Sequence, residues 1–298
     1  MELGIVGLGK MGMNISMRLK DRFDIAGCDV DETAQAKATE LGIKAFPNIE
    51  SLINHFPHKK TIWVMVPTGE IRDRVLNELL LKLNPKDIVI DGTNSYYKSS
   101  IEYHKRFSNK HISYLDAGVS GGIYGLHRGF CLMVGGSKET YNELTDIFES
   151  LSAKDGCIYT GEAGSGHYVK MVHNAIEYGM MQSIAEGMEL LKDGYFKDLD
   201  IKNICRTWNN GSIIASFLLE TIYNALNKNT DMSKIKAFVA DTGEGRWAAM
   251  EAIEYKIPAY NIIQSLLCRF QSQKEESLFC KMLSLMRNEF GGHDILLK

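Results

Sequence analysis

The sequence lacks the features that mark secreted, membrane-bound, metal-binding or nucleic-acid-binding proteins. Its six cysteines are scattered, without a C-x-x-C pair or a metal-ligand spacing, and its apolar N-terminus lacks the basic segment of a signal peptide. No apolar run approaches the ~18 residues that span a bilayer. The net charge of −3 argues against a broad nucleic-acid surface. We therefore expect a cytoplasmic protein with reduced thiols, no metal, no membrane contact and no nucleic-acid partner.

Proline is scarce too, with five residues among 298, and four of them precede residue 86. Glycine is unevenly spread, because 19 of the 27 glycines lie at or before residue 166. The chain is 45% hydrophobic and 24% charged, which is close to average for globular proteins, so disorder is not a dominant feature. The length suits about two domains. The skew predicts a loop-rich first half and a helix-rich second half.

Short β-branched runs alternate with helical patterns through the first half of the chain. Strands are expected at 3–6, 23–29, 43–46, 61–66, 87–92, 111–119 and 130–135. Helices are expected at 10–20, 31–41, 48–56 and 70–83, and then at 167–192, 200–227, 231–254 and 259–290. The sequence therefore predicts an α/β domain over 1–164, with a doubly wound, mainly parallel Rossmann-type sheet. An all-α domain follows over 165–298, with the boundary in the turn GEAGSG (161–166).

A glycine-rich hexapeptide follows the first strand and opens the first helix, as a dinucleotide-binding G-x-G-x-x-G motif requires. It consists of Gly7, Leu8, Gly9, Lys10, Met11 and Gly12. The first glycine allows the tight turn, the second lets the backbone approach a pyrophosphate, and the third allows close helix–strand packing. The helix N-terminus then points at the anion. The alternative is an ordinary strand–turn–helix corner.

Asp29 ends the second strand, where an acidic residue receives the adenosine ribose hydroxyls. A 2′-phosphate at this place would face Asp29 and Asp31, with Val30 between them and no arginine. The sequence therefore predicts NAD in preference to NADP. The alternative is that one of these carboxylates only caps the next helix. Val66 and Pro67, at the end of the strand expected over 61–66, are assigned to the same cofactor site.

Five polar residues share one face of the helix expected from residue 167. At about 100° per residue they fall within an arc of roughly 140°. They are Lys170, His173, Asn174, Glu177 and Tyr178. The remaining faces are apolar, with Val169, Met171, Val172, Ala175, Ile176 and Met180. We expect a buried helix whose polar stripe lines a cleft, and the alternative is a solvated face with ordinary i, i+4 pairs.

Lys170 and Glu177 are two turns apart, roughly 10 Å along the helix axis. That spacing suits the two ends of a sugar-acid substrate better than a direct salt bridge. In a dry site, a lysine can lose its proton near neutral pH and act as a base. A glutamate there can hold a proton and act as an acid. The pattern therefore predicts an acid–base pair.

The string VKMVHNAIEYGMMQ (169–182) resembles the signature of 6-phosphogluconate dehydrogenase, the decarboxylating enzyme of the pentose phosphate pathway. Further strings agree in order: GLGKMGMN (7–14), DGTNSYY (91–97), DAGVSGG (116–122), GEGRW (243–247) and RNEFGGH (287–293). The resemblance spans nearly the whole chain. The short length and the acidic end of the second strand look most like the NAD-preferring branch of this family, which belongs to the β-hydroxyacid dehydrogenases.

The resemblance implies a mechanism with two catalytic residues. Lys170 takes the hydroxyl proton while the cofactor takes hydride from C3 of 6-phosphogluconate. The 3-keto acid loses carbon dioxide, and Glu177 protonates the enediol at C1 to give ribulose 5-phosphate. The keto group is the electron sink, so no metal is implied.

The resemblance also implies a substrate site and a homodimer or higher homo-oligomer. The matching substrate-binding residues are Asn94, Ser120, Gly121, Gly122, His173, Asn174, Tyr178, Arg269, Arg287 and His293. Asn94 also contacts the cofactor, and its alternative role is an Asx-turn. Arg269, with the pair Arg287 and His293, holds the phosphate in this family, whereas each arginine taken alone is more often a solvated surface charge.

The chain departs from the longer family members at two positions. Thr242 replaces a family lysine, and Glu244 replaces a small polar residue, so Arg246 and Lys256 are candidates for the missing phosphate contacts. The closest alternative function is that of a 3-hydroxyisobutyrate dehydrogenase-like enzyme. A non-catalytic dinucleotide sensor would have no use for both Lys170 and Glu177.

Overall fold

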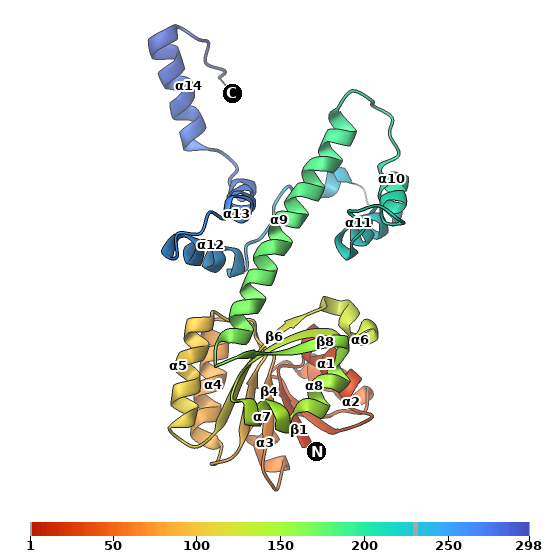
Figure 1. Cartoon of the computed structure of the whole chain (residues 1–298), viewed down its shortest axis with the longest axis vertical. Coiled ribbons are helices and arrows are strands. Elements are labelled where there is room, and N and C mark those ends of the chain that lie inside the picture. The colour runs from red at the N-terminus through yellow and green to blue at the C-terminus, as the bar shows by residue number, and fades with distance from the viewer. Residues whose placement is uncertain (1, 229–231, 298) are drawn as a thin grey trace. The chain divides into compact units, whose positions relative to one another are not determined.

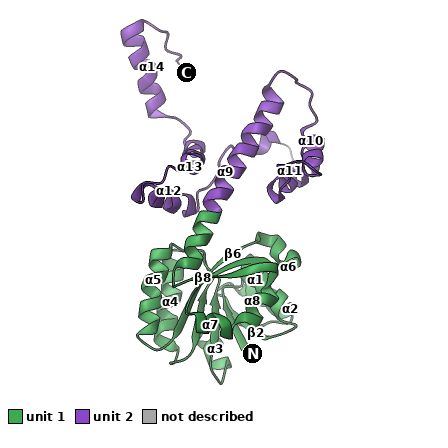
Figure 2. Cartoon of the chain, in the orientation of Figure 1, with its two compact units in different colours: residues 1–173 green, residues 174–298 purple. Residues whose placement is uncertain are grey.

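The computed structural model describes residues 2–228 and 232–297 and divides into two units, residues 1–173 and 174–298 (Figure 2). The division falls between His173 and Asn174, inside the helix α9 (Ser165–Asp193). The division into domains at 164/165 stays a prediction of the sequence pattern.

The first unit is built on one eight-stranded sheet with the order β3-β2-β1-β4-β5-β6-β7-β8. Its strands are β1 (Glu2–Val6), β2 (Asp24–Cys28), β3 (Lys44–Phe46), β4 (Thr61–Val64), β5 (Ile88–Asp91), β6 (Ser113–Ser120), β7 (Phe130–Gly136) and β8 (Ser152–Gly161). All neighbours are parallel except β6 and β7, which are antiparallel. The predicted α/β, mainly parallel sheet is confirmed, and the sequence pattern missed β8.

Helices cover both faces of this sheet, because alternate strand residues are apolar on both sides. They are α1 (Lys10–Leu19), α2 (Glu32–Glu40), α3 (Ile49–His55), α4 (Glu70–Lys82), α5 (Tyr97–Ser108), α6 (Gly125–Arg128), α7 (Lys138–Glu143) and α8 (Thr145–Leu151). In β4, Trp63 joins the core that α1 and α8 share, whereas Ile62 and Val64 join the core formed with α3, α4 and α5. Figure 1 shows these helices around the sheet. Because β1, β4 and β5 are parallel neighbours, their carboxyl ends meet at one edge of the sheet.

The second unit is helical, as predicted. Beyond α9 its helices are α10 (Ile201–Trp208), α11 (Phe217–Asn227), α12 (Glu244–Glu254), α13 (Tyr260–Ser272) and α14 (Leu278–Gly291). Tyr178 of α9 packs with Ala249 of α12 and Leu266 of α13 in a small core. None of the helices in the described ranges is long and apolar enough to cross a membrane.

Three of the predicted long helices were wrong in their extent. The segment 200–227 breaks after α10, where Gly211 has a φ of 101° and Asn209 accepts a hydrogen bond from the Ser216 backbone. The helix predicted over 231–254, whose first residue lies outside the described ranges, begins only at Glu244, after Gly243 with a φ of 111°. The segment 259–290 breaks before Ser277, which caps α14. Polar caps of this kind resemble ordinary helix residues in a sequence pattern.

Candidate active site

The glycine loop after β1 has the geometry that a pyrophosphate needs. Gly7 has a φ of +96°, and a Cβ on Gly12 would lie 1.9 Å from the Gly7 carbonyl oxygen. A Cβ on Gly9 would meet no atom within 4 Å, so the backbone is open at that point. Gly9 has no side chain to cap α1, and the first turn of α1 has no acidic residue. The first N–H groups of α1 therefore remain available to an anion, and the loop fits a dinucleotide.

A cavity of about 550 Å³ lies beside this loop. Five of the predicted cofactor residues line it: Gly7, Gly9, Asp29, Val66 and Pro67. The others, which are Leu8, Lys10, Met11, Gly12 and Asn94, are not among its lining residues. Gly12 and the Leu8 side chain are buried under the loop, whereas the Lys10 side chain is exposed. The cavity is thus formed at the carboxyl ends of β1, β2 and β4.

The carboxylate of Asp29 faces the glycine loop and does not cap the next helix. Its Oδ2 accepts a hydrogen bond from the Leu8 backbone at 2.7 Å, and its Oδ1 accepts one from the Asp31 backbone at 3.0 Å. The cap of α2 is Asp31, which accepts a hydrogen bond from the Thr33 backbone. The alternative role as a helix cap therefore applies to Asp31.

Sequence reasoning missed the wall that α4 contributes to the cavity. Arg74 and Glu78 both line it, so the expectation of no arginine near a 2′-phosphate was incomplete. The surroundings still carry negative charge. Burial raises the pKa of the Cys28 thiol to about 12, and the carboxylates of Asp29 and Glu78 add to this shift. The sequence of α4 contains no motif that indicates that this helix lines the cavity.

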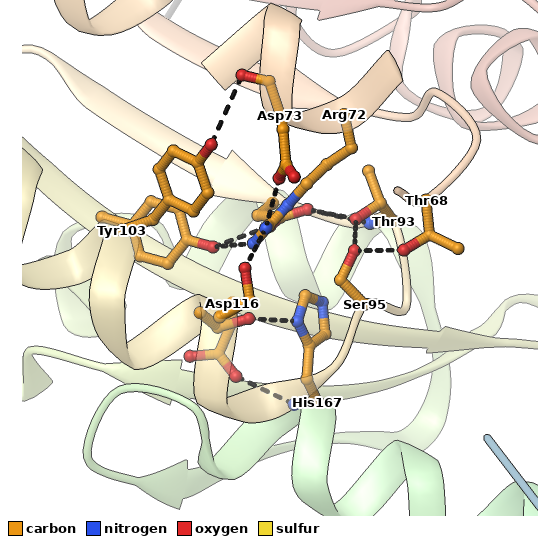
Figure 3. A network of polar contacts seen from close by, with 12 residues as sticks. Thr68, Arg72, Asp73, Thr93, Ser95, Tyr103, Asp116 and His167 are labelled. Carbon is orange, nitrogen blue, oxygen red and sulfur yellow. Dashed lines mark hydrogen bonds and ion pairs between the residues drawn. The ribbon is translucent and has the colours of Figure 1, made fainter. Parts of the chain in front are cut away.

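A buried ion pair holds the loop that follows β5. Arg72 of α4 donates two hydrogen bonds to Asp91 Oδ2, at 2.9 and 2.7 Å, and both side chains are almost fully buried. Tyr114 donates to the same oxygen at 2.6 Å, and Thr93 donates to Oδ1. Thr93 Oγ1 lies 2.7 Å from Ser95 Oγ, and Figure 3 shows this chain of contacts.

The same network sets the charge state of Asp91. Burial is the largest single effect and raises the pKa of this carboxyl, but Arg72, His167 and the hydrogen bonds from Thr93 and Tyr114 together outweigh it and lower the pKa from 3.8 to about 2. Burial raises the pKa of the Tyr114 phenol well above 10, so the phenol remains a donor. A signal for this pair exists in the sequence, because Arg72 lies on the same helix row as the buried Leu76 and Leu79.

Asn94 lies in the loop that this network holds. Its φ is 54°, a left-handed conformation that asparagine tolerates. Its side-chain amide donates to the Val119 carbonyl at 3.1 Å and its Oδ1 accepts from the Val119 N–H at 2.9 Å. These two hydrogen bonds join the loop after β5 to the end of β6. The side chain of Asn94 thus makes a long-range contact and not the Asx-turn that was its alternative role, and its contact with cofactor and substrate stays a prediction.

The start of α9 lies against the end of β6 within the first unit. The Lys170 side chain is buried, and its Nζ lies 3.4 Å from His173 Nδ1. His173 Nε2 lies 3.5 Å from Ser120 Oγ. Gly121 and Gly122 follow with φ values of 121° and 51°, and both are exposed. Lys170, His173 and Ser120 are therefore neighbours, and the roles that the resemblance implies for them and for the two glycines stay predictions.

The second unit holds its own cluster of predicted residues. Asn174 donates to Glu244 Oε1 at 2.9 Å, and Thr242 donates to Glu244 Oε2 at 2.5 Å. The Tyr178 hydroxyl lies 3.2 Å from Thr242 Oγ1. The Arg269 guanidinium lies 3.3 Å from the centre of the Tyr178 ring. The two positions that depart from the longer family members, 242 and 244, thus bond to each other.

The other predicted residues of the second unit are less constrained. Glu177 is half-buried on α9, seven residues after Lys170. Arg246 forms an ion pair with Asp241 at 2.6 Å, and Lys256 is exposed. Arg287 lies on α14 and His293 follows it, both with exposed side chains. Within residues 232–297, no hydrogen bond or ion pair joins either of them to Arg269.

The apolar faces of α9 are only partly buried, contrary to the sequence expectation. Met171 and Ala175 are buried, but Val169, Ile176 and Met180 are 39%, 51% and 44% exposed. A helix pattern alone does not tell which apolar faces another element covers. Among the described side chains, no group of three or more His, Cys, Asp or Glu is placed to hold a metal ion.

Two family models together match nearly the whole chain. The NAD-binding domain of 6-phosphogluconate dehydrogenase matches residues 2–161, and the C-terminal domain of 6-phosphogluconate dehydrogenase matches residues 166–292. An NAD(+)-dependent, decarboxylating 6-phosphogluconate dehydrogenase of Haloferax volcanii is 38% identical, over 100% of this chain and 99% of its own length.

Solved structures show the same likeness. The 6-phosphogluconate dehydrogenase of Plasmodium falciparum, solved in its apo form and in complexes with NADP+ and with 6-phosphogluconate, has a TM-score of 0.83 and 30% identity. The likeness covers 100% of this chain and 66% of that chain. The 3-hydroxyisobutyrate dehydrogenase of Mycobacterium tuberculosis has a TM-score of 0.71 over 89% of this chain and 90% of its own, but at 21% identity this shows the fold alone.

Proposed function

The chain belongs to the 6-phosphogluconate dehydrogenase family, and on this premise we propose that it oxidises and decarboxylates 6-phosphogluconate to ribulose 5-phosphate with a nicotinamide cofactor. The observation that carries the proposal is the match of both domains in one chain together with the buried Lys170 beside His173 and Ser120. This activity belongs to the oxidative pentose phosphate route and to gluconate use.

The residues of the chain have separate tasks in this reaction. A nicotinamide cofactor held at the cavity beside Gly7, Gly9 and Asp29 would supply the hydride acceptor. Lys170, as a neutral amine, accepts the proton of the C3 hydroxyl as C3 becomes a ketone. Ser120 and the N–H groups of Gly121 and Gly122 hold the carboxylate. The C1–C2 bond then breaks and carbon dioxide leaves. The electron pair of that bond passes into the C3 carbonyl, whose oxygen takes back the proton from Lys170 to give an enediol.

Glu177 completes the reaction by donating a proton to the enediol carbon that was C2 of the substrate and becomes C1 of ribulose 5-phosphate. Lys170 accepts the proton of the neighbouring hydroxyl, which becomes the ketone. It lies on the helix that carries Lys170, and seven residues separate the two. Base and acid therefore stay roughly 10 Å apart along the axis. Asn94, His173, Asn174 and Tyr178 hold the hydroxyl groups, and Arg269 with Arg287 and His293 serves the phosphate.

A direct assay tests this function. Purified protein is mixed with 6-phosphogluconate and NAD or NADP, and reduced nicotinamide and carbon dioxide are both measured. We expect both products in equal amounts, and no turnover of 3-hydroxyisobutyrate. Turnover of 3-hydroxyisobutyrate alone would assign the chain to the related dehydrogenases. Cofactor binding without turnover of either acid would indicate a dinucleotide sensor.

NAD is the preferred cofactor in this proposal. The Asp29 carboxylate at the cavity supports it, because it suits ribose hydroxyls and repels a 2′-phosphate. We expect kcat/KM to be higher with NAD than with NADP. The variant Asp29→Asn should lower the ratio of kcat/KM with NAD to kcat/KM with NADP about tenfold, because ~1.4 kcal/mol of repulsion is removed. Parallel kinetics with both cofactors measure this.

Arg74→Ala is the matched control for Asp29→Asn, because both residues line the same cavity. If Arg74 does not receive a 2′-phosphate, its removal changes kcat/KM for both cofactors by similar factors. A wild-type enzyme with a higher kcat/KM for NADP would overturn the preference for NAD.

We also infer a homo-oligomer, at least a dimer, located in the cytoplasm. The six cysteines are free thiols, which supports a reducing compartment. None of the residues of α14 is buried, although the helix is rich in apolar side chains. Those that are exposed are Leu278, Phe279, Met282, Leu283, Leu285, Met286 and Phe290. Exposed apolar surface of this extent marks an interaction site.

The exposed apolar side chains of α14 therefore predict that copies of the chain associate in solution. Sedimentation velocity should give a mass of at least two chains, and Leu285→Glu should shift it toward the monomer. Leu81→Glu on α4 is the matched control, because Leu81 is also exposed and should leave the mass unchanged. A wild-type monomer at micromolar concentration would rule the oligomer out.

A further inference from the structure

The first turn of α9 receives its cap from a strand that lies far earlier in the chain. Asp116 of β6 is fully buried, and its carboxylate accepts hydrogen bonds from the Gly164 N–H at 2.6 Å and the His167 N–H at 2.8 Å. A helix N-terminus has unpaired N–H groups and a partial positive charge, so a carboxylate stabilises it. Most helices obtain this bond from the residue just before them. Here the cap ties the helix to the centre of the sheet.

Two further residues on the same face of β6 contact the next turns of α9. Strand residues at i, i+2 and i+4 share a face, so Gly118 and Ser120 lie in line with Asp116. A Cβ on Gly118 would lie 2.4 Å from Lys170 Cβ. Ser120 Oγ lies 3.5 Å from His173 Nε2. Every second residue of the strand thus meets every third residue of the helix: the strand residues are Asp116, Gly118 and Ser120, and the helix residues are His167, Lys170 and His173.

The packing at this contact leaves little room for the helix to slide or rotate. A Cβ on Gly166 would lie 2.4 Å from the carbonyl oxygens of both Asp116 and Met133. The side chain of His167 is also buried, and its Nδ1 lies 2.7 Å from Ser100 Oγ of α5. Figure 3 shows Asp116 and His167 side by side. The first turn is therefore fixed at its backbone and at one side chain.

We propose that Asp116 is a positioning residue for the oxidation step, because it fixes where α9 begins and so where the Lys170 amine lies. Its carboxylate is fully buried and accepts hydrogen bonds from the Gly164 and His167 N–H groups, so its effect on the reaction would pass through the helix. Lys170 lies one turn beyond His167, whose N–H the carboxylate holds, so a shift of the first turn moves the amine with it. The inference rests on the proposed function, since it takes Lys170 as the base.

The variant Asp116→Asn tests the proposal. An amide cannot accept both hydrogen bonds without placing an NH₂ group against one of the N–H groups. We expect kcat for 6-phosphogluconate to fall about 30- to 100-fold, the effect of a base displaced by about 1 Å. The Kd for NADH should stay within about threefold, because the cofactor cavity lies at the ends of β1, β2 and β4. The KM for 6-phosphogluconate should change by much less than kcat, because substrate contacts tolerate a small shift of α9 better than proton transfer does. Steady-state kinetics and NADH fluorescence titration measure these quantities.

Asp87→Asn is the matched control. Asp87 is buried as well and also accepts two backbone hydrogen bonds, from Lys60 at 2.8 Å and Asn84 at 2.9 Å. It precedes β5, whereas the loop with Asn94 follows β5, so it lies at the opposite end of that strand. Both variants should lower Tm to a similar degree. Only Asp116→Asn should lower kcat, and only it should speed hydrogen exchange in the peptide around 164–170.

A second variant covers the case in which Asp116→Asn does not fold. Gly118→Ala leaves the cap intact but pushes a methyl group against Lys170, and it should reduce kcat with the same pattern. A kcat of Asp116→Asn equal to that of the control, or a normal kcat for Gly118→Ala, would overturn the proposal. A wild-type protein that does not turn over 6-phosphogluconate would instead remove the proposed function on which it rests.

Discussion

Replacing Lys170 with methionine should lower kcat for oxidation of 6-phosphogluconate by about 10³- to 10⁴-fold. Methionine keeps most of the length of the side chain but cannot accept a proton, and a positioned base contributes up to about 10⁴-fold to such a step. Because Lys170 is only 5% exposed, an apolar replacement should leave the fold intact. The rate of appearance of reduced nicotinamide measures the loss, and the Kd for NADH should be unchanged.

Glu177→Gln is the comparison that separates the two catalytic roles. This variant keeps Lys170, so hydride transfer in a single turnover should run at nearly the wild-type rate. Release of ribulose 5-phosphate should be slow, because glutamine does not protonate the enediol at C1. Hydride transfer within tenfold of wild type in Lys170→Met would exclude that residue as the base. Equal losses in the hydride step of both variants would contradict the separation of roles.

Much of the fold follows from local pattern. The G-x-G-x-x-G loop and the alternating strands are short-range signals, and the structure places them as expected. The helix breaks near residues 209–216 and 273–277 were missed. The first break carries a turn signal in Asn210 and Gly211 that was overlooked, whereas the second has no Pro or Gly, and Ser277 caps α14 there. The strand β8 was missed for a related reason, since its sequence SAKDGCIYTG alternates poorly.

The candidate site was predictable where one element carries it. The stripe on α9 was visible because a helix repeats every 3.6 residues. The bonds of Asp116 to Gly164 and His167 were not visible, because 48 and 51 residues separate the partners. Only the sheet order brings β6 next to them. The sequence does carry a signal for the buried Arg72, because an arginine on an apolar helix row indicates a buried partner. That the partner is Asp91 follows only from the order of the strands in the sheet.

Asp91→Asn should lower the free energy of unfolding by about 3–5 kcal/mol at pH 7. The change leaves the Arg72 guanidinium buried without its charged partner, which is the costly way to break a buried ion pair. Urea unfolding followed by circular dichroism measures the loss. The double variant Arg72→Met with Asp91→Asn should recover part of it, because the uncompensated charge is then absent. A double variant less stable than Asp91→Asn would show that the charge is not the cause.

The dependence of this loss on pH gives a separate test of the same cause. Burial raises the pKa of Asp91, but Arg72, together with His167 and the hydrogen bonds from Thr93 and Tyr114, outweighs burial and holds the pKa at about 2, below its ordinary value of 3.8. A lowered pKa in the folded state stabilises the protein fully above 3.8, and this contribution disappears as pH falls toward 2. The difference in unfolding free energy between wild type and Asp91→Asn should therefore be constant from about pH 7 to 5 and shrink below about pH 4. A difference that does not change between pH 5 and 3 would mean that Asp91 acts through its shape and hydrogen bonds, not through its charge.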